Sequence, residues 1–301
     1  MDPACDSVRR ARPLLGTFVE ISVTDARRPD TEAAVDAAFA AVAKVHRLMS
    51  FHECASDVSR LNREAHERAV AVDTWTFAVL EAALDLHHQS AGAFDIAVAP
   101  ALQALGLLPD DVRSASPLRA TDGDVELLAD RRVRFRHPNV RIDLGGIAKG
   151  FAVDRAVDVL KDRGIRSALV NAGGDLAALG AEPHTVHVRD PRDPRRLLCA
   201  VDVRGEALAT SGGRIDPFRS DAAAGAAVID PGTGAPVGAV RGATVRAPSC
   251  MLADALTKAV MVAPATAPAL LDRFDASALI VVADGSVRVT ASWRDAVRLA
   301  A

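Results

Sequence analysis

Apolar residues recur every three or four positions in several segments, which is the spacing that places them on one face of a helix. The clearest case is Thr31–Met49, whose apolar positions are Val35, Ala38, Phe39, Val42, Val45 and Met49. Asp30 or Thr31 is suited to begin that helix, because a short polar side chain can accept a free backbone N–H. Further helices are expected at residues 73–90, 148–163, 249–262 and 264–274, with a short one from residue 292.

Short segments rich in β-branched residues stand between the predicted helices and indicate strands. The first covers residues 14–24 and is entered through a glycine turn, and residues 125–128 and 132–135 suggest a hairpin. Other strands are expected at residues 140–144, 168–171, 185–189, 197–203, 226–229 and 240–245, with a terminal hairpin at 279–289. Because several of these segments look like hairpin pairs, a purely parallel sheet is not expected. The sequence therefore predicts a mixed α/β protein.

The strongest local motif is DLGGIAKG at residues 143–150, where a predicted strand meets a helix through two glycines. Such a junction exposes backbone N–H groups at the positive end of the helix, which suits an anion such as a pyrophosphate, and Lys149 would add charge. A close-packed turn explains the same spacing equally well. Four more small-residue turns, at 92–95, 171–175, 209–213 and 230–234, favour a ligand cleft lined by loops.

Asp254 and Lys258 stand four residues apart in an otherwise apolar predicted helix, so both lie on one face of it. A simple salt bridge explains the pair, and a carboxylate that binds a hard cation such as Mg²⁺ is the functional alternative. Only four of the 36 basic residues are lysines, and a site that needs a compact point charge cannot take arginine instead. Lys44 and Lys161 belong to no motif.

Composition narrows the classes of function. The net charge of −3 with interspersed signs and the aromatic content of 4% argue against nucleic-acid binding. No apolar run is long enough to cross a membrane, and residues 1–13 contain no leader-like apolar stretch, so a cytoplasmic location is expected. The four cysteines are scattered and form no zinc-site spacing. Small molecules and proteins are the expected partners.

Taken in order, these motifs make the chain resemble the ApbE family, the FAD:protein FMN transferases. The segments that carry the resemblance are residues 14–17, 49–52, 59–62, 92–95 with Pro100, 143–150, 171–175, 209–212, 228–231 with Gly234, and 253–256. The resemblance covers almost the whole chain. It implies one domain over residues 1–301, built as two intertwined lobes with a T-fold-like core and a flavin cleft between the lobes.

The resemblance also implies an activity and a set of residues. Family members move FMN from FAD to a Thr or Ser hydroxyl of an acceptor flavoprotein and release AMP, using Mg²⁺. Carried over by position, the metal ligands would be the Gly146 carbonyl and the Asp254 carboxylate, with His52 in the place of a ring that stacks on the flavin. The residues expected to bind FAD are Leu15, Phe51, His52, Ala93, Phe94, Asp95, Asp143, Lys149, Asn171, Asp175 and Ile229.

Two positions depart from the family pattern. Lys258 stands where a Thr usually completes the metal site, so Lys258 is a candidate to supply a positive charge in the cation's place, with Thr257 as a less favoured alternative ligand. Ala227 stands where a His usually serves as the base for the acceptor hydroxyl. Besides FMN transfer, the sequence leaves open a protein that binds FAD without catalysis and an FAD pyrophosphatase, in which water replaces the acceptor.

Overall fold

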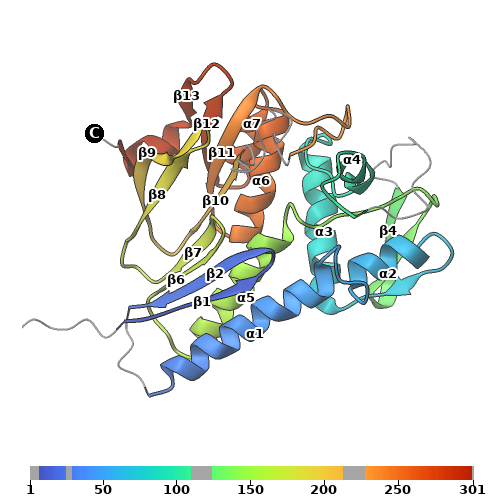
Figure 1. Cartoon of the computed structure of the whole chain (residues 1–301), viewed down its shortest axis with the longest axis horizontal. Coiled ribbons are helices and arrows are strands. Elements are labelled where there is room, and N and C mark those ends of the chain that lie inside the picture. Colours follow the sequence, from blue (N-terminus) through green and yellow to red (C-terminus); the bar gives the residue numbers. More distant parts are fainter. Residues whose placement is uncertain (1–6, 25–28, 110–123, 213–227, 300–301) are drawn as a thin grey trace, which may run out of the picture.

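The structure is a computed structural model that describes residues 7–24, 29–109, 124–212 and 228–299. Its largest element is an eight-stranded sheet in the order β1-β2-β6-β7-β10-β11-β12-β13 (Figure 1). Each neighbouring pair is antiparallel, which confirms that the sheet is not parallel. The strands are Val8–Leu14, Thr17–Val23, Ala168–Ala172, Asp175–Leu179, Ala207–Gly212, Val240–Ala247, Ser277–Val282 and Val287–Val289.

Three helices, α1 (Thr31–Met49), α5 (Ala148–Asp162) and α6 (Cys250–Val262), pack on this sheet and on one another. Helix α1 has the bounds that its apolar spacing predicts. All six apolar positions of that spacing are buried. The structure thus confirms that the helical periodicity marks the core-facing side, since burying this stripe is the main stabilising contribution of such a helix.

A second group of elements lies beside the sheet and holds helices α2 (Asp57–Glu64), α3 (Thr74–Gln89) and α4 (Ala99–Ala104) (Figure 1). Helix α3 begins after Asp73, whose side chain accepts the Trp75 N–H at 2.9 Å, as expected for an N-cap. Strands β4 (Val125–Leu128) and β5 (Arg132–Phe135) form the predicted hairpin, joined by the short helix η2 (Ala129–Arg131) and extended by β3 (Val70–Ala71).

The remaining elements are a third sheet and two short helices. Strands β8 (His184–Asp190), β9 (Asp193–Val203) and β14 (Val297–Leu299) form a third sheet. Helix α7 (Ala267–Arg273) precedes β12, and the short helix η4 (Ala291–Ala296) follows β13. Trp293 is fully buried in a separate small core, whose other members come from β8 and β9 and from β7, β10 and β12 of the large sheet.

The predicted strand at residues 140–144 is wrong. This stretch joins no sheet because its backbone is bound by other partners: the Asn62 side chain accepts the Ile142 N–H at 2.8 Å and donates to the Ile142 carbonyl at 2.9 Å. The Asp143 N–H reaches the Ile96 carbonyl at 2.8 Å. The apolar run is buried as expected, but it serves as an anchored connection into helix α5.

Candidate active site

The start of helix α5 is held against helix α6 at a glycine. A Cβ on Gly150 would lie 2.1 Å from the Cys250 carbonyl oxygen, so only glycine permits this approach. The Gly150 N–H donates to Asp254 at 3.0 Å across the same contact. The close approach therefore brings Lys149, the neighbour of Gly150, to the carboxylate of Asp254.

Asp154 makes a second connection between the two helices. Its carboxylate accepts the N–H of Cys250 at 2.7 Å and of Met251 at 2.8 Å, which supplements the Ser249 N-cap of α6. Burial raises the pKa of Asp154 to about 6, and the two backbone N–H groups oppose that rise only partly. Asp154 thus fixes the start of the helix that carries Asp254 and Lys258.

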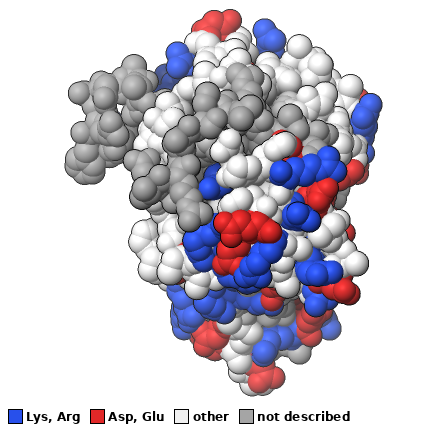
Figure 2. Space-filling model, turned by 90° about the vertical axis from the view of Figure 1, so that its right-hand side faces the viewer, with Lys and Arg blue, Asp and Glu red and all other residues white. Residues whose placement is uncertain are grey.

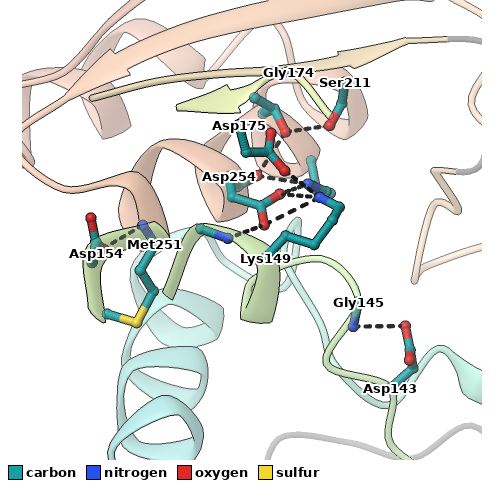
Figure 3. A network of polar contacts seen from close by, with 12 residues as sticks. Asp143, Gly145, Lys149, Asp154, Gly174, Asp175, Ser211, Met251 and Asp254 are labelled. Atoms are coloured by element: carbon teal, nitrogen blue, oxygen red, sulfur yellow. Dashed lines mark hydrogen bonds and ion pairs between the residues drawn. The ribbon is translucent and has the colours of Figure 1, made fainter. Parts of the chain in front are cut away.

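A compact network of two acids and two lysines lies where α5, α6 and β7 meet (Figure 3). Asp175 and Asp254 are almost fully buried, and both carboxylates point at the Lys149 ammonium. Lys149 Nζ pairs with Asp175 and lies 3.5 Å from each carboxylate oxygen of Asp254. Lys258 Nζ pairs with the Asp254 carboxylate and donates to the Asp254 carbonyl at 2.9 Å.

Charge pairing decides the protonation states in this network. Burial lowers the pKa of Lys149, but the carboxylates of Asp254 and Asp175 outweigh it and the pKa is well above its ordinary value. Burial works to raise the pKa of Asp254, yet the ammonium groups of Lys149 and Lys258 outweigh it and the pKa is lowered. Burial and the Asp254 charge raise the pKa of Asp175. Lys149 is therefore a cation and Asp254 an anion at neutral pH.

Two adjoining cavities open beside this network. The first, which we call the Lys258 cavity, holds about 490 Å³ and includes Gly146, Lys149, Asp175 and Lys258 in its lining. The second, the Phe51 cavity, holds about 440 Å³. The two share the lining residues Leu108, Asp143, Gly145 and Lys149, so together they form an extended hollow with the lysine ammonium groups near its middle.

Most residues expected to bind FAD meet in these cavities. The Lys258 cavity is lined by Ala93, Phe94, Asp95, Asp143, Lys149, Asp175 and Ile229. The Phe51 cavity adds Leu15, Phe51 and His52. Asn171 lines neither cavity, and its side chain instead accepts the Gly174 N–H at 2.9 Å, which shapes the turn next to the lining residue Gly173. Asp254 and Thr257 are completely buried behind the lining.

Asp143 stands apart from the lysine network and borders both cavities. Its carboxylate turns toward its own loop and accepts the Gly145 N–H at 3.0 Å (Figure 3). Burial raises the pKa of Asp143, while the Gly145 N–H and the positive charges around it work in the other direction. The carboxylate thereby fixes the glycine loop at the junction of the two cavities.

Several lining residues were not singled out from the sequence. Ser211, next to the last residue of β10, lines the Lys258 cavity, and so do Leu102 in α4 and Leu107 and Leu108 after α4. The small-residue turn at 209–213 was a signal for Ser211, but the leucines carried none, because apolar residues are usual in any core. His184 and His187 lie in the third sheet and line neither cavity. Ala227 is outside the described residues.

Comparisons with known proteins agree with this arrangement. The ApbE family matches residues 15–280. An FAD:protein FMN transferase of Treponema pallidum is 30% identical over 321 aligned positions, covering 96% of this chain and 88% of its own length. One from Vibrio cholerae is 29% identical, covering 85% of this chain and 81% of its own. The crystal structure of an ApbE protein from Thermotoga maritima superposes with a TM-score of 0.84 at 26% identity, covering 97% of this chain and all of that one.

The mixed α/β fold described above is thus shared with ApbE proteins of known structure. The chain belongs to the ApbE family.

Proposed function

We propose that this chain is an FAD:protein FMN transferase, which moves FMN from FAD to a Thr or Ser hydroxyl of an acceptor flavoprotein and releases AMP. The observation that carries the proposal is the position of Lys149 and Lys258 at the lining of the extended hollow. FAD is an elongated dinucleotide with a diphosphate at its middle. Two adjoining cavities with cationic groups near their junction suit that shape and charge.

The residues have distinct roles in this proposal. Phe51, His52 and Leu15 contact one half of FAD in the Phe51 cavity. Ala93, Phe94, Asp95 and Ile229 contact the other half, and Asp143 and Asp175 hold the loop and the ammonium groups between them. Asn171 acts indirectly, through the turn at Gly174.

In the transfer step, the acceptor hydroxyl oxygen forms a bond to the phosphorus on the FMN side of the diphosphate. The bond between that phosphorus and the bridging oxygen breaks, AMP leaves with that oxygen, and the hydroxyl proton passes to solvent. Positive charge beside the diphosphate stabilises the charge that develops on the leaving AMP, which is the main way a protein accelerates this type of reaction. This role is supported by the two carboxylates that pair with Lys149 and hold its ammonium group at the lining of both cavities.

The Mg²⁺ that family membership implies does not fit the residues around Asp254 as they are arranged. The carboxylate already binds Lys149, Lys258 and the Gly150 N–H. Among the described residues, no group of three His, Cys, Asp or Glu side chains is placed to hold a metal ion. No catalytic step is therefore assigned to a metal here.

The test is to incubate the purified chain with FAD, with and without an acceptor flavoprotein domain, and to follow AMP by chromatography and acceptor fluorescence after denaturation. We expect AMP and a fluorescent acceptor in equal amounts, and little AMP without acceptor. AMP that appears equally without acceptor would identify an FAD pyrophosphatase instead. FAD binding without AMP in either case would leave an FAD-binding protein and overturn the transferase proposal.

The acceptor and the location in the cell belong to the same proposal. The acceptor binds transiently, since it must leave after each transfer. Within the described residues, no helix has both the length and the apolar character needed to cross a membrane. The cytoplasmic location expected from the sequence stays a prediction, which fractionation of the native host would test.

A further inference from the structure

The oxygen atoms of Asp254 are already bound within the protein. One carboxylate oxygen pairs with Lys258, the other accepts the Gly150 N–H at 3.0 Å, and Lys149 Nζ lies 3.5 Å from both. The Asp254 carbonyl accepts the Thr257 hydroxyl at 2.7 Å and Lys258 Nζ at 2.9 Å. Mg²⁺ needs oxygen ligands at about 2.0–2.1 Å, so it could bind here only by displacing an ammonium group.

The Lys258 side chain also fills the space that such an ion would need. A Cβ on Gly146 would lie 3.6 Å from Lys258 Cε and 3.9 Å from Cδ. The alkyl part of the lysine therefore passes directly over Gly146 on its way to Asp254. An ion bound by both Gly146 and Asp254 would have to lie between these two residues. The Lys258 side chain already occupies that position.

Thr257 offers no replacement ligand in this arrangement. Its hydroxyl has a single proton, which it donates to the Asp254 carbonyl at 2.7 Å. The contact of 2.7 Å between Thr257 Oγ1 and Ser211 Oγ must then be donated by Ser211. Thr257 is completely buried and does not line the Lys258 cavity, and its oxygen is bound between the Asp254 carbonyl and the Ser211 hydroxyl.

We propose that the ammonium group of Lys258 takes the place of a divalent metal ion beside the FAD diphosphate, so that this enzyme binds FAD and transfers FMN without a metal. The proposal rests on the function proposed above. Lys258 Nζ uses two of its three protons on Asp254, which leaves one N–H for a diphosphate oxygen in the cavity that it lines. The bonds made and broken in the transfer are unchanged, because the cation is not consumed.

The first experiment measures metal binding directly and needs no activity. Mn²⁺ is titrated into the metal-free chain, with and without FAD, and followed by electron paramagnetic resonance. We expect the wild-type chain to have no Mn²⁺ site that depends on Asp254. The wild-type chain and Asp254→Asn should therefore bind Mn²⁺ equally little. Mn²⁺ held by the wild-type chain and lost in Asp254→Asn would overturn the proposal, whether or not the protein transfers FMN.

The second experiment compares FAD affinity in EDTA and in millimolar Mg²⁺. For the wild-type chain we expect the two dissociation constants and the two rates of AMP release to agree within about twofold. Lys258→Met should weaken FAD binding roughly tenfold to a hundredfold, the range for losing one charge-assisted hydrogen bond. Lys161→Met, at an exposed position on α5, removes the same charge elsewhere and should leave binding unchanged.

The third experiment is Lys258→Thr, which removes the ammonium group and its alkyl chain from the space between Gly146 and Asp254. We expect this variant to bind FAD weakly in EDTA and to recover at least tenfold in Mg²⁺. Tenfold or greater stimulation of the wild-type chain by Mg²⁺ would contradict the proposal. Absence of transfer under all conditions would sink the transferase function alone, since the Mn²⁺ and FAD titrations still decide the role of Lys258.

Discussion

Lys149 lies where the two cavities and the buried acids meet. It borders both cavities and is the partner of Asp175 and Asp254, which are nearly inaccessible to solvent. A buried carboxylate without its cation is strongly destabilising, because no water replaces the lost partner. The same ammonium group thus stabilises the fold and, in the function proposed above, binds the diphosphate.

Lys149→Met is expected to change both properties. FAD affinity should fall at least tenfold, and the free energy of unfolding should fall by about 3 kcal/mol, as for breaking a buried ion pair. Isothermal titration with FAD and urea unfolding measure the two effects. Lys161→Met is the matched control, and a Lys149→Met protein with unchanged FAD affinity would exclude Lys149 from the binding site.

Gly146 and Gly150 provide a contrast within one motif. A Cβ on Gly150 would clash with the backbone of Cys250, whereas one on Gly146 would make ordinary contacts of 3.6 Å with Lys258 and Phe94. Gly150→Ala should therefore lower the free energy of unfolding by about 3 kcal/mol or more, and Gly146→Ala by less than about 1 kcal/mol. Urea unfolding of both variants checks this. Equal stabilities would show that α5 and α6 are not held at this contact.

At the scale of elements, the contact between α5 and α6 places Asp254 and Lys258, and Asp154 lies in it. The pKa of Asp154 is raised to about 6 from an ordinary 3.8, so the folded state binds its proton more tightly than the unfolded state does. Asp154 therefore favours folding below about pH 4, and this contribution is lost as the pH rises to about 6.

The pH dependence is isolated by comparing the wild-type chain with Asp154→Asn. From pH 4 to pH 7, the stability of the wild-type chain relative to the variant should decrease, by up to about 3 kcal/mol. Urea unfolding at several pH values measures this difference. A difference that stays constant, or grows with pH, would contradict a raised pKa at Asp154.

Elements with a regular pattern could be predicted from the sequence. Helix α1 and the β4 and β5 hairpin have the predicted bounds, because periodic burial and turn residues are local signals. The strand predicted at residues 140–144 does not form, because the side chain of Asn62, far away in the chain, binds both the N–H and the carbonyl of Ile142. Strand β7 was not predicted, since its small buried residues carry no alternation between its two faces.

Part of the candidate site could be predicted from the sequence, because some of its residues belong to local motifs. Motif segments such as 92–95 and 143–150 carry their signal locally, and the structure brings them to one hollow. Leu102, Leu107 and Leu108 have no such signal, because only the folded chain places them at the cavity. The orientation of Thr257 is likewise set by Ser211 on another element.

At the scale of the whole molecule, the large sheet and helices α2 and α3 share one core. The main cluster of buried residues runs without interruption from Val19 in β2 through Leu80 in α3 to Leu256 in α6. On the face shown in Figure 2, Lys and Arg are interspersed with Asp and Glu.

We propose that residues 1–301 form one domain of two intertwined lobes, as the sequence predicts. A shared core should make the lobes unfold together, so calorimetry should show a single transition that FAD shifts to higher temperature as a whole. Two separated transitions, with only one of them moved by FAD, would show that the lobes are independent domains.

The central claim is FMN transfer, and the intact mass of the acceptor tests it most directly. After incubation with FAD, the acceptor flavoprotein domain should gain the mass of one FMN less one water, and an acceptor whose target Thr or Ser is replaced by Ala should gain nothing. The wild-type chain should give this product and Lys149→Met very little. An acceptor of unchanged mass, with FAD bound to the chain and intact, would contradict the claim.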